Sequence, residues 1–569
     1  MGEPIESSEI ETAISKMENN KTLGPDGLTK EFYSIFSKEL IPVLKEVFSV
    51  IFEKGSLCKS QKVSYISLLC KNVEQPEFCK NYRPISLLNV DYKILTKVLC
   101  AHLSPCLENI VHPDQTCSVP GRTIFDNCHL IRDIINDTNS NPLDTGIILS
   151  TDQEKAFDRV NHTYMLSVLK YFGFSENFIR WISIIYNDIS SAVIVNKHVS
   201  TPFPFKRSVR QGCPLSPLLY VLCLEPMLKA IREDKNIKGL HIAGYKEQCK
   251  LSAFADDCKF LLKNVTSVER VLAHFDAFGT YSGSKLNKTK TEVMYLGRGR
   301  LLQHFPLDLK LVKSMKIFGI LLGDVSMDDI WHPLYIKVEK VLNLFKSRQL
   351  SMYGKGKLIN TMALSKLWYV ATVVPLSTHY ATLLTRLAFH FVLGKIESVK
   401  RDTLYLPCKE GGINLVNVFM KAQSLMLTQV VKVLEHRKSP WVAFGHKYLG
   451  LTLRHFPNYA FENNSPHCIE NPPLYYKLCL EYLQNIKVKD PNFVFKPGLS
   501  CKLIYAQLIN INKYKPRCVI TFPTINFKTV FANLCNKVID RVVLNVSFKL
   551  AHDIIPVAYK LNSWNFFQV

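Results

Sequence analysis

The feature that most constrains the fold is a pair of short apolar segments that run into acidic residues. GIILSTD (146–152) is an apolar run that stops at Asp152, and KLSAFADDCKFLL (250–262) has two apolar arms around Asp256 and Asp257. The first segment predicts a buried strand and the second a β-hairpin. An ionised carboxylate beside such apolar surroundings is costly unless it is paired with a cation or a metal ion. The two segments therefore predict a sheet whose strand ends carry acidic side chains.

The chain between these segments has the alternation of an α+β domain. Apolar periodicity predicts helices over 164–172 and 178–189, two strands around a turn at Asn196-Lys197, and a further helix that opens at Ser216-Pro217. The order strand, helices, hairpin, helix, hairpin predicts one antiparallel sheet with helices on one face, of the split βαβ type.

Two strand ends of one sheet can be neighbours even when they are far apart in the sequence. If Asp152 and Asp256 meet, the cluster could hold two divalent ions about 3.5–4 Å apart, the arrangement used for in-line phosphoryl transfer. Hard Mg²⁺ suits such oxygen ligands. Because successive strand residues face opposite ways, we rank Asp152 and Asp256 above Asp257 as ligands. The alternative for the Asp-Asp pair is a solvated turn, and periodicity alone leaves the two interpretations close to even.

Composition narrows the class of partner. The 569 residues include 71 Lys and Arg against 48 Asp and Glu, a formal charge of +23, which favours nucleic acid first and anionic membrane second. No stretch approaches the roughly 18 apolar residues of a spanning helix, and residues 1–16 lack the apolar core of a secretory signal. The 17 cysteines are scattered without the close pairs of a zinc site. We therefore expect a soluble, intracellular protein that uses neither membrane nor zinc.

The flanking segments are mainly helical. Residues 7–54 show helical periodicity, and the chain beyond residue 330 becomes helical and basic. Within 331–360 six lysines and arginines, including Lys337 and Lys340, stand against one acid. Such a charge run is either a nucleic-acid surface or an ordinary solvated helix face.

Six motifs follow one another along the chain: NYRPISLL (81–88), DQEKAFDRV (152–160), RQGCPLSPLL (210–219), FADD (254–257), SGSKLNKTKTEVM (282–294) and IFGILLG (317–323). Taken together they are highly specific, whereas FADD alone would mean little. The chain resembles the reverse transcriptase of a non-long-terminal-repeat retrotransposon, of the long interspersed element type. The resemblance runs from residue 21 to about residue 418.

The resemblance implies a right-hand polymerase of the α+β class, with fingers, an antiparallel split-βαβ palm and a helical thumb. A mainly helical C-terminal region follows. We expect an N-terminal helical extension leading into the fingers (1–60), fingers (61–145), a palm with the catalytic motifs and primer grip (146–325), a basic helical thumb and connection (326–440), and a region of unknown role (441–569).

The resemblance also implies a metal site. Asp152, Asp256 and Asp257 match the metal-binding triad of such polymerases, which use Mg²⁺ and can take Mn²⁺ in its place. Gln153 stands where many relatives have alanine. That position contributes its backbone carbonyl to the metal, so the change of side chain should be tolerable.

Further positions match the nucleotide site of the family. Phe157 matches the aromatic gate that excludes a 2′-hydroxyl, with plain core packing as the alternative. Gln211 and Gly212 match the motif beside the incoming nucleotide. Arg83 matches an arginine that clamps triphosphate oxygens, with a surface salt bridge as the alternative.

The remaining matches concern proton transfer and the template–primer. Lys290 matches a lysine that gives a proton to pyrophosphate, and Lys285 and Lys288 are alternatives for that role. Arg122 is a candidate for a phosphate or template contact. The resemblance places Phe318 and Gly319 in the primer grip, and it places Lys337 and Lys340 on a thumb helix that tracks the duplex.

The expected activity is therefore RNA-directed DNA polymerisation by two-metal phosphoryl transfer, as in target-primed retrotransposition. The partners would be an RNA template, a DNA primer and dNTPs, and nuclear location is implied by the family alone. The sequence shows no endonuclease, so that activity would come from another chain or a missing segment. The alternative is a truncated, catalytically silent element copy that at most binds nucleic acid.

Overall fold

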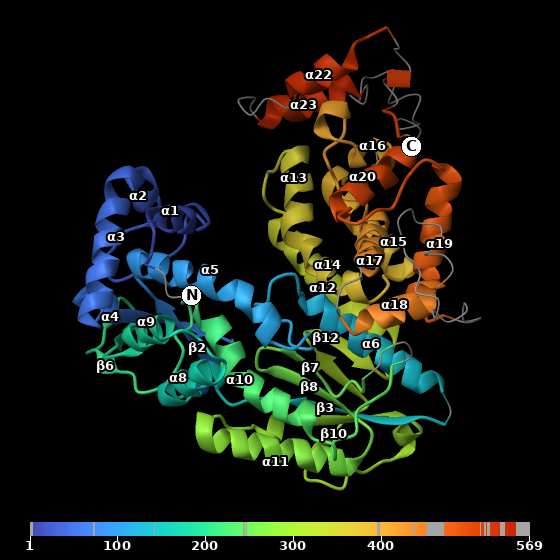
Figure 1. The fold of residues 1–569 in the computed structure, drawn as a ribbon. Coiled ribbons are helices and arrows are strands. Elements are labelled where there is room, and N and C mark those ends of the chain that lie inside the picture. Colours follow the sequence, from blue (N-terminus) through green and yellow to red (C-terminus); the bar gives the residue numbers. More distant parts are fainter. Residues whose placement is uncertain are drawn as a thin grey trace. The chain divides into compact units, whose positions relative to one another are not determined.

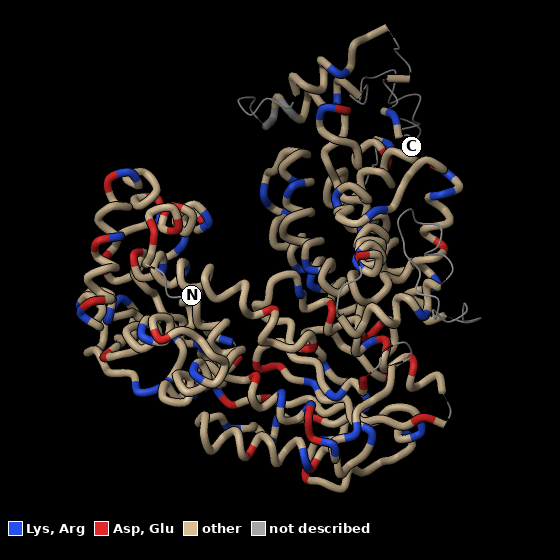
Figure 2. Tube along the Cα trace, in the orientation of Figure 1, with Lys and Arg blue, Asp and Glu red and all other residues tan. Residues whose placement is uncertain are grey.

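The computed structural model forms two compact units, one up to Gly319 and one from Ile320 onward (Figure 1). Lysine and arginine are distributed over both units (Figure 2). Within the described residues, no helix is long and apolar enough to cross a membrane. The structure describes residues 4–71, 74–141, 143–242, 245, 247–394, 399–435, 439–450, 472–512, 514–516, 519–520, 524–534 and 541–552.

Eleven helices are described in the first unit, and they confirm the predicted helical segments within 7–54, 164–172 and 178–189. They are α1 (Ser7–Ser15), α2 (Lys30–Ile35), α3 (Ser37–Lys54), α4 (Lys59–Lys62), α5 (Val90–Ile110), α6 (Ile124–Ser140), α7 (Ala156–Arg159), α8 (His162–Tyr171), α9 (Glu176–Tyr186), α10 (Ser216–Glu233) and α11 (Val265–Ser282).

The first of two sheets in this unit contains both acidic segments. Its strand order is β10-β9-β3-β8-β7, with β3 in the middle and antiparallel to both β8 and β9. Strands β7 and β8 form the predicted hairpin, and only the short β10 runs parallel to its neighbour β9. The strands are β3 (Thr145–Thr151), β7 (Leu251–Phe254), β8 (Asp257–Leu262), β9 (Glu292–Gly297) and β10 (Lys310–Leu311).

Helices contact both faces of this sheet, so the prediction of helices on one face is wrong. Ser252 and Lys259 are cross-strand partners on one face, where Asn127 of α6 donates a hydrogen bond to the Ser252 hydroxyl (2.7 Å). Phe260 points to the other face, where its ring contacts Phe275 of α11. The cause is visible in β3, whose apolar residues are consecutive rather than alternating and are buried on both sides.

The strands around Asn196-Lys197 belong to a second sheet, so the prediction of a single sheet is also wrong. β4 pairs in parallel with β1 and antiparallel with β5 and β6, and β1 pairs antiparallel with β2. The turn itself is as predicted, with φ of 49° at Asn196 and 69° at Lys197. The strands are β1 (Val63–Cys70), β2 (Tyr82–Leu87), β4 (Ser190–Val195), β5 (His198–Val199) and β6 (Phe203–Pro204).

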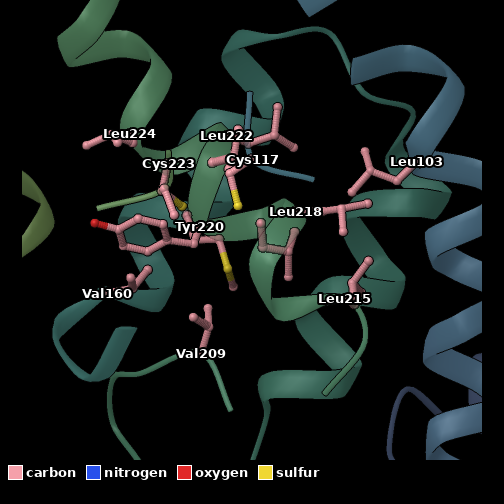
Figure 3. Close-up of a cluster of buried hydrophobic side chains, with 14 of the residues drawn as sticks. Leu103, Cys117, Val160, Val209, Leu215, Leu218, Tyr220, Leu222, Cys223 and Leu224 are labelled. Carbon is pink, nitrogen blue, oxygen red and sulfur yellow. The ribbon is translucent and has the colours of Figure 1, made fainter. Parts of the chain in front are cut away.

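Helix α10 is the buried axis of the first unit. Its apolar residues point in every direction, which is the pattern of a helix enclosed by other elements. Figure 3 shows Leu218 and Tyr220 among side chains from other elements, including Leu103 of α5 and Val160, which follows α7. Fully burying one such leucine contributes about 1.5–3 kcal/mol. The loop that precedes α10 therefore leads into a firmly held helix.

Buried ion pairs tie the end of α10 to the segment that follows α5. Arg232 donates to both carboxylate oxygens of Asp114 (2.8 Å each) and to Glu225 (2.7 Å). The backbone carbonyl of Asp114 accepts a hydrogen bond from Ala253 of β7 (2.8 Å). The network thus connects α10 to the hairpin that carries the two adjacent aspartates.

This network predicts a component of acid instability. Burial raises the pKa of Asp114, but the charges and hydrogen bonds of Arg232 and His112 outweigh it and lower the pKa to about 2. A carboxyl with a lowered pKa stabilises the fold above its unfolded pKa of about 3.9, and this contribution is lost as the pH falls through about 2. We expect Asp114→Asn to lower the free energy of unfolding by about 2 kcal/mol at pH 7 and by progressively less below pH 4.

The measurement is urea denaturation of both proteins at several pH values. Asp276→Asn, at an exposed position of α11, is the control that should follow the wild type. If the free energies of unfolding of wild type and Asp114→Asn differ by the same amount at every acid pH, the Asp114 carboxylate does not cause the acid instability.

The chain passes from the first unit to the second through a two-stranded hairpin, β11 (Ser314–Ile317) and β12 (Ile320–Gly323). The rest of the described second unit is helical, as predicted. Its helices are α12 (Met327–Phe345), α13 (Met352–Leu358), α14 (Ser365–Val373), α15 (Thr378–Leu393), α16 (Arg401–Tyr405), α17 (Val418–Leu434), α18 (Trp441–Leu449), α19 (Leu474–Lys489), α20 (Cys501–Ile511), α22 (Phe527–Leu534) and α23 (Arg541–Ala551).

Candidate active site

A cleft of about 1500 Å³ in the first unit brings together most of the predicted site residues. Its walls come from β2, the segment after β3, the loop before α10, the turn of the β7–β8 hairpin, α11 and the segment that follows α11. The predicted residues that line it are Arg83, Asp152, Gln153, Phe157, Gln211, Gly212, Asp256, Lys285, Lys288 and Lys290.

Two carboxylates meet in this cleft. Asp152 directly follows β3, and Asp256 lies in the hairpin turn beside Ala255, whose φ is 54°. Burial raises the pKa of Asp256, and the neighbouring carboxylates of Asp257 and Asp152 raise it further, while Arg83 lowers it. The repulsion between these carboxylates is relieved by a cation, so their oxygen donors fit a hard divalent metal ion.

The third carboxylate has a different orientation. Asp257 is not among the residues that line the cleft, and its carboxylate forms an ion pair with Lys259 on the same strand. Within the described residues, no group of three or more His, Cys, Asp or Glu side chains is arranged to hold a metal ion. The chain therefore offers two carboxylates to the cleft and keeps the third beside a lysine.

A backbone ladder fixes the lysine-rich segment beside the first carboxylate. Asn287 donates its N–H to the carbonyl of Asp152, and Glu154 donates to the carbonyl of Lys285, both at 2.8 Å. Lys290 Nζ lies 3.9 Å from the Asp152 carboxylate, and Lys285 Nζ lies 3.8 Å from that of Glu154. The ladder brings positive charge to the Asp152 side of the cleft.

Gln153 sits inside this ladder. Its pairing with Leu286 is a bridge whose two hydrogen bonds are made by the flanking residues, so its own carbonyl takes no part in them. The side-chain oxygen of Gln153 accepts hydrogen bonds from Ser284 (2.8 Å) and Tyr220 (3.2 Å). The glutamine side chain thus links α10 to the segment after α11.

Phe157 presents a half-buried ring to the cleft. The ring stacks on Tyr220 of α10, with centroids 4.6 Å apart and planes 11° from parallel. The carbonyl of Phe157 accepts a hydrogen bond from Val209 (2.9 Å). One face of the ring is therefore supported by the buried helix while the residue still lines the open space.

The Gln211-Gly212 pair approaches β2 at backbone distance. The carbonyl of Gln211 accepts a hydrogen bond from the N–H of Ser86 (2.7 Å). Gly212 has φ of 122°, and a Cβ there would lie 2.5 Å from the carbonyl oxygen of Ser86. Glycine is required both by the backbone angle and by this close approach.

Two residues that support the site were missed by the sequence reasoning. Asp158 accepts a hydrogen bond from Gln211 Nε2 (2.9 Å), and burial raises the pKa of Asp158. Its place directly after Phe157 in the motif was an available signal. Buried Gln115 bonds both backbone groups of Ala255, accepting at 3.0 Å and donating at 3.4 Å, and so holds the turn that carries Asp256. No periodicity signals that contact.

The two predicted arginines occupy different settings. Arg83 is exposed on β2 and lines the cleft, and no described acidic side chain forms an ion pair with it. Arg122 lies outside the cleft lining and donates to four backbone carbonyls at 2.6–3.3 Å, from Glu108 to Gln115. Its guanidinium holds the end of α5 against the following loop.

The predicted template–primer residues lie beyond the cleft lining. Phe318 and Gly319 form the turn of the β11–β12 hairpin, with φ of 47° and 86°. Lys337 and Lys340 are exposed on α12.

Comparison with known proteins bears on this geometry. Residues 70–332 match the family described as reverse transcriptase (RNA-dependent DNA polymerase). The predicted resemblance to the reverse transcriptases of non-long-terminal-repeat retrotransposons is confirmed. The reverse transcriptase match contains every predicted site residue except Lys337 and Lys340.

Three relatives illustrate the similarity. The chain is 32% identical over 453 residues to the transposon TX1 uncharacterized 149 kDa protein of Xenopus laevis, a match that covers 77% of this chain. It is 26% identical to a retrovirus-related Pol polyprotein from the type-1 retrotransposable element R2 of Popillia japonica, over 51% of this chain. It is 24% identical to that of the type-2 element R2DM of Drosophila melanogaster, over 50% of this chain. The matches span 34%, 39% and 26% of these relatives' lengths.

Proposed function

We propose that this chain is an RNA-directed DNA polymerase that extends the 3′-hydroxyl of a primer on an RNA template with dNTPs. The observation that carries the proposal is the meeting of Asp152 and Asp256 in one cleft with Phe157 and the Gln211-Gly212 pair. These elements come from three separate motifs of the reverse transcriptase match. Their convergence supports a nucleotide-binding palm.

Different residues of the cleft would bind the metal ions and supply the proton in phosphoryl transfer. Asp152, Asp256 and the carbonyl of Gln153, joined by Asp257, would hold two magnesium ions, with manganese as a substitute. When bound, these ions lower the pKa of the attacking hydroxyl and neutralise the leaving pyrophosphate. Lys290 holds a proton for that pyrophosphate, with Lys285 and Lys288 as alternatives on the same segment.

Other cleft residues bind the nucleotide. Arg83, exposed and without an ion-pair partner among the described acids, binds the triphosphate oxygens. Phe157 lies beneath the sugar, where its ring is supported by Tyr220 and leaves no room for a 2′-hydroxyl. The Gln211-Gly212 backbone borders the nucleotide.

The wider organisation follows the same proposal. The proposed organisation begins with an N-terminal extension (1–60) that leads into the fingers (61–145). The palm (146–325) follows, then the thumb and connection (326–440) and a further region (441–569). Phe318 and Gly319 grip the primer, and Lys337 and Lys340 track the template–primer backbone. Arg122, whose donors are engaged by carbonyls, acts by holding its loop rather than by direct contact with nucleic acid.

The biological setting is proposed from the relatives, whose names place one in a transposon and another in a retrotransposable element. The chain would copy an element RNA from a nicked chromosomal end, with the nick made by another chain or by a segment outside this sequence. That cycle implies a nuclear location.

The test of the proposed function is primer extension on an RNA template with Mg²⁺ and dNTPs, for which we expect full-length product. Template–primer binding without extension would instead support the silent, nucleic-acid-binding copy.

The aromatic gate gives a prediction on substrate choice. We expect Phe157→Ala to raise the efficiency of ribonucleotide incorporation relative to deoxynucleotide by at least about tenfold, because the ring no longer opposes a 2′-hydroxyl. The measurement is the ratio of kcat/KM for rNTP and dNTP in single-nucleotide extension. Phe172→Ala, another half-buried phenylalanine but outside the cleft lining, is the matched control. An unchanged ratio in Phe157→Ala would assign the ring to core packing.

A further inference from the structure

The sheet that carries the acidic hairpin also contains a buried lysine that no role above requires. Lys259 of β8 is only 3% exposed. Burying an ammonium group is costly unless charges and hydrogen bonds compensate for it. Its described contacts are an ion pair with Asp257, a hydrogen bond to the Ser150 hydroxyl (2.6 Å) and the ring of Phe318, whose centroid lies 5.7 Å from Nζ.

Strand geometry explains why this lysine holds Asp257. The two residues are separated by one position on β8, so their side chains share a face. Ser150 is the cross-strand partner of Lys259 on β3 and lies on that same face. The Asp257 carboxylate is therefore drawn back along the strand toward Lys259, while Asp256 lines the cleft and Asp257 does not.

The ring of Phe318 adds to the strength of this pair. It comes from the turn of the β11–β12 hairpin and lies close to the ammonium group. An aromatic ring within about 6 Å attracts a cation and also excludes water from it. Only the lysine end of the pair is buried, since the Asp257 side chain is 41% exposed and its carboxylate stays accessible to solvent and to a metal ion. Lys259 is thus a well-held internal cation beside a proposed metal ligand.

We propose that Lys259 is a positioning residue that competes with divalent metal ions for the Asp257 carboxylate. This inference rests on the proposed function, since it takes Asp257 as a metal ligand. In the metal-free protein the ammonium group neutralises Asp257 and keeps it out of the cleft. A metal ion must draw the carboxylate from Lys259, so the lysine sets the concentration of divalent ion that the site requires.

The proposal predicts tighter metal binding when the charge is removed. In Lys259→Gln no ion pair opposes the movement of Asp257, and one positive charge near the metal is gone. Both changes act in the same direction, so we expect the Kd for Mn²⁺ to fall by about tenfold. Lys259→Arg keeps the charge and should retain an affinity close to that of the wild type.

The measurement is calorimetric titration of Mn²⁺ into the metal-free full chain, without nucleic acid or nucleotide. The matched control is Lys263→Gln, because Lys263 follows the same strand and forms an ion pair with Asp144 at the other end of the sheet. In an Asp257→Asn background, the effect of Lys259→Gln should shrink to the smaller part that the loss of the lysine charge alone causes. Melting temperatures establish that each variant is folded.

A second variant covers the case in which Lys259→Gln does not fold. Ser150→Ala removes the other polar partner of Lys259 and leaves its ammonium group to Asp257 alone, so Mn²⁺ binding should weaken severalfold. Unchanged affinity in the folded variants, or an effect of Lys259→Gln that is undiminished in Asp257→Asn, overturns the inference. Absence of Mn²⁺ binding by the wild type overturns it as well.

The outcome is separable from the fate of the proposed function. Normal primer extension together with unchanged Mn²⁺ affinity in Lys259→Gln would refute the role of the lysine alone. Mn²⁺ affinity that depends on Lys259, in a chain that extends no primer, would refute the polymerase activity and leave the lysine's role intact.

Discussion

Asp256→Asn should reduce primer extension by at least about a thousandfold, since loss of one well-placed electrostatic group already costs about 10²–10³ in rate and this carboxylate also binds metal. The amide preserves the shape of the side chain and its place in the hairpin turn, but removes the negative charge that faces Asp152. Single-turnover extension on an RNA template at saturating dNTP measures the loss directly.

The control for this substitution lies in the same cleft. Asp276 of α11 also lines it, but it is exposed and comes from none of the six motifs. Asp276→Asn should therefore keep its extension rate within a fewfold of wild type. If both variants lose activity equally, the general charge of the cleft is responsible and the pairing of Asp152 with Asp256 has no special role.

Gly212→Ala is expected to have the second-largest effect on primer extension, through a different cause. Its Cβ would lie 2.5 Å from the carbonyl oxygen of Ser86, so either β2 or the loop before α10 must move. Movement there breaks the hydrogen bond from Ser86 to Gln211. A displacement of about 1 Å at a reacting site can cost about a hundredfold in rate, which is the loss we expect in kcat.

Gly173→Ala separates backbone strain from the clash. Gly173 also has a positive φ, 74°, but a Cβ there meets nothing within 4 Å. It should cost about 1 kcal/mol of stability and leave the extension rate unchanged. Equal loss of activity in the two variants would mean that the close approach to Ser86 does not matter.

Local patterns predicted the parts of this molecule that depend on near neighbours. The strand that ends before Asp152, the hairpin at Asp256 and the turn at Asn196-Lys197 were all visible as short-range signals. The parallel pairing of β4 with β1 was not, because it joins segments more than a hundred residues apart through backbone hydrogen bonds that leave no periodic trace. For this reason the sequence predicted one sheet where the first unit has two.

In the candidate site, too, short-range patterns predicted some features, while contacts between distant segments determined others. Because side chains alternate along a strand, we ranked Asp257 below Asp256 as a metal ligand. Of these two aspartates, Asp256 lines the cleft in the structure and Asp257 does not. The partner that draws Asp257 aside is Lys259, which in the sequence is one lysine among many. The contact of Gln115 with the hairpin turn was not predicted either, since it depends on how two distant loops pack.

The ladder between Asp152 and the segment at Lys285 has a consequence for how this molecule can change over evolutionary time. Because main-chain atoms alone make its hydrogen bonds, most substitutions at these positions leave the joint intact. The lysines can therefore vary in length and charge without detaching the strand end they accompany. Successive substitutions in this segment could therefore change the side chains beside Asp152 one at a time while the backbone pairing is kept.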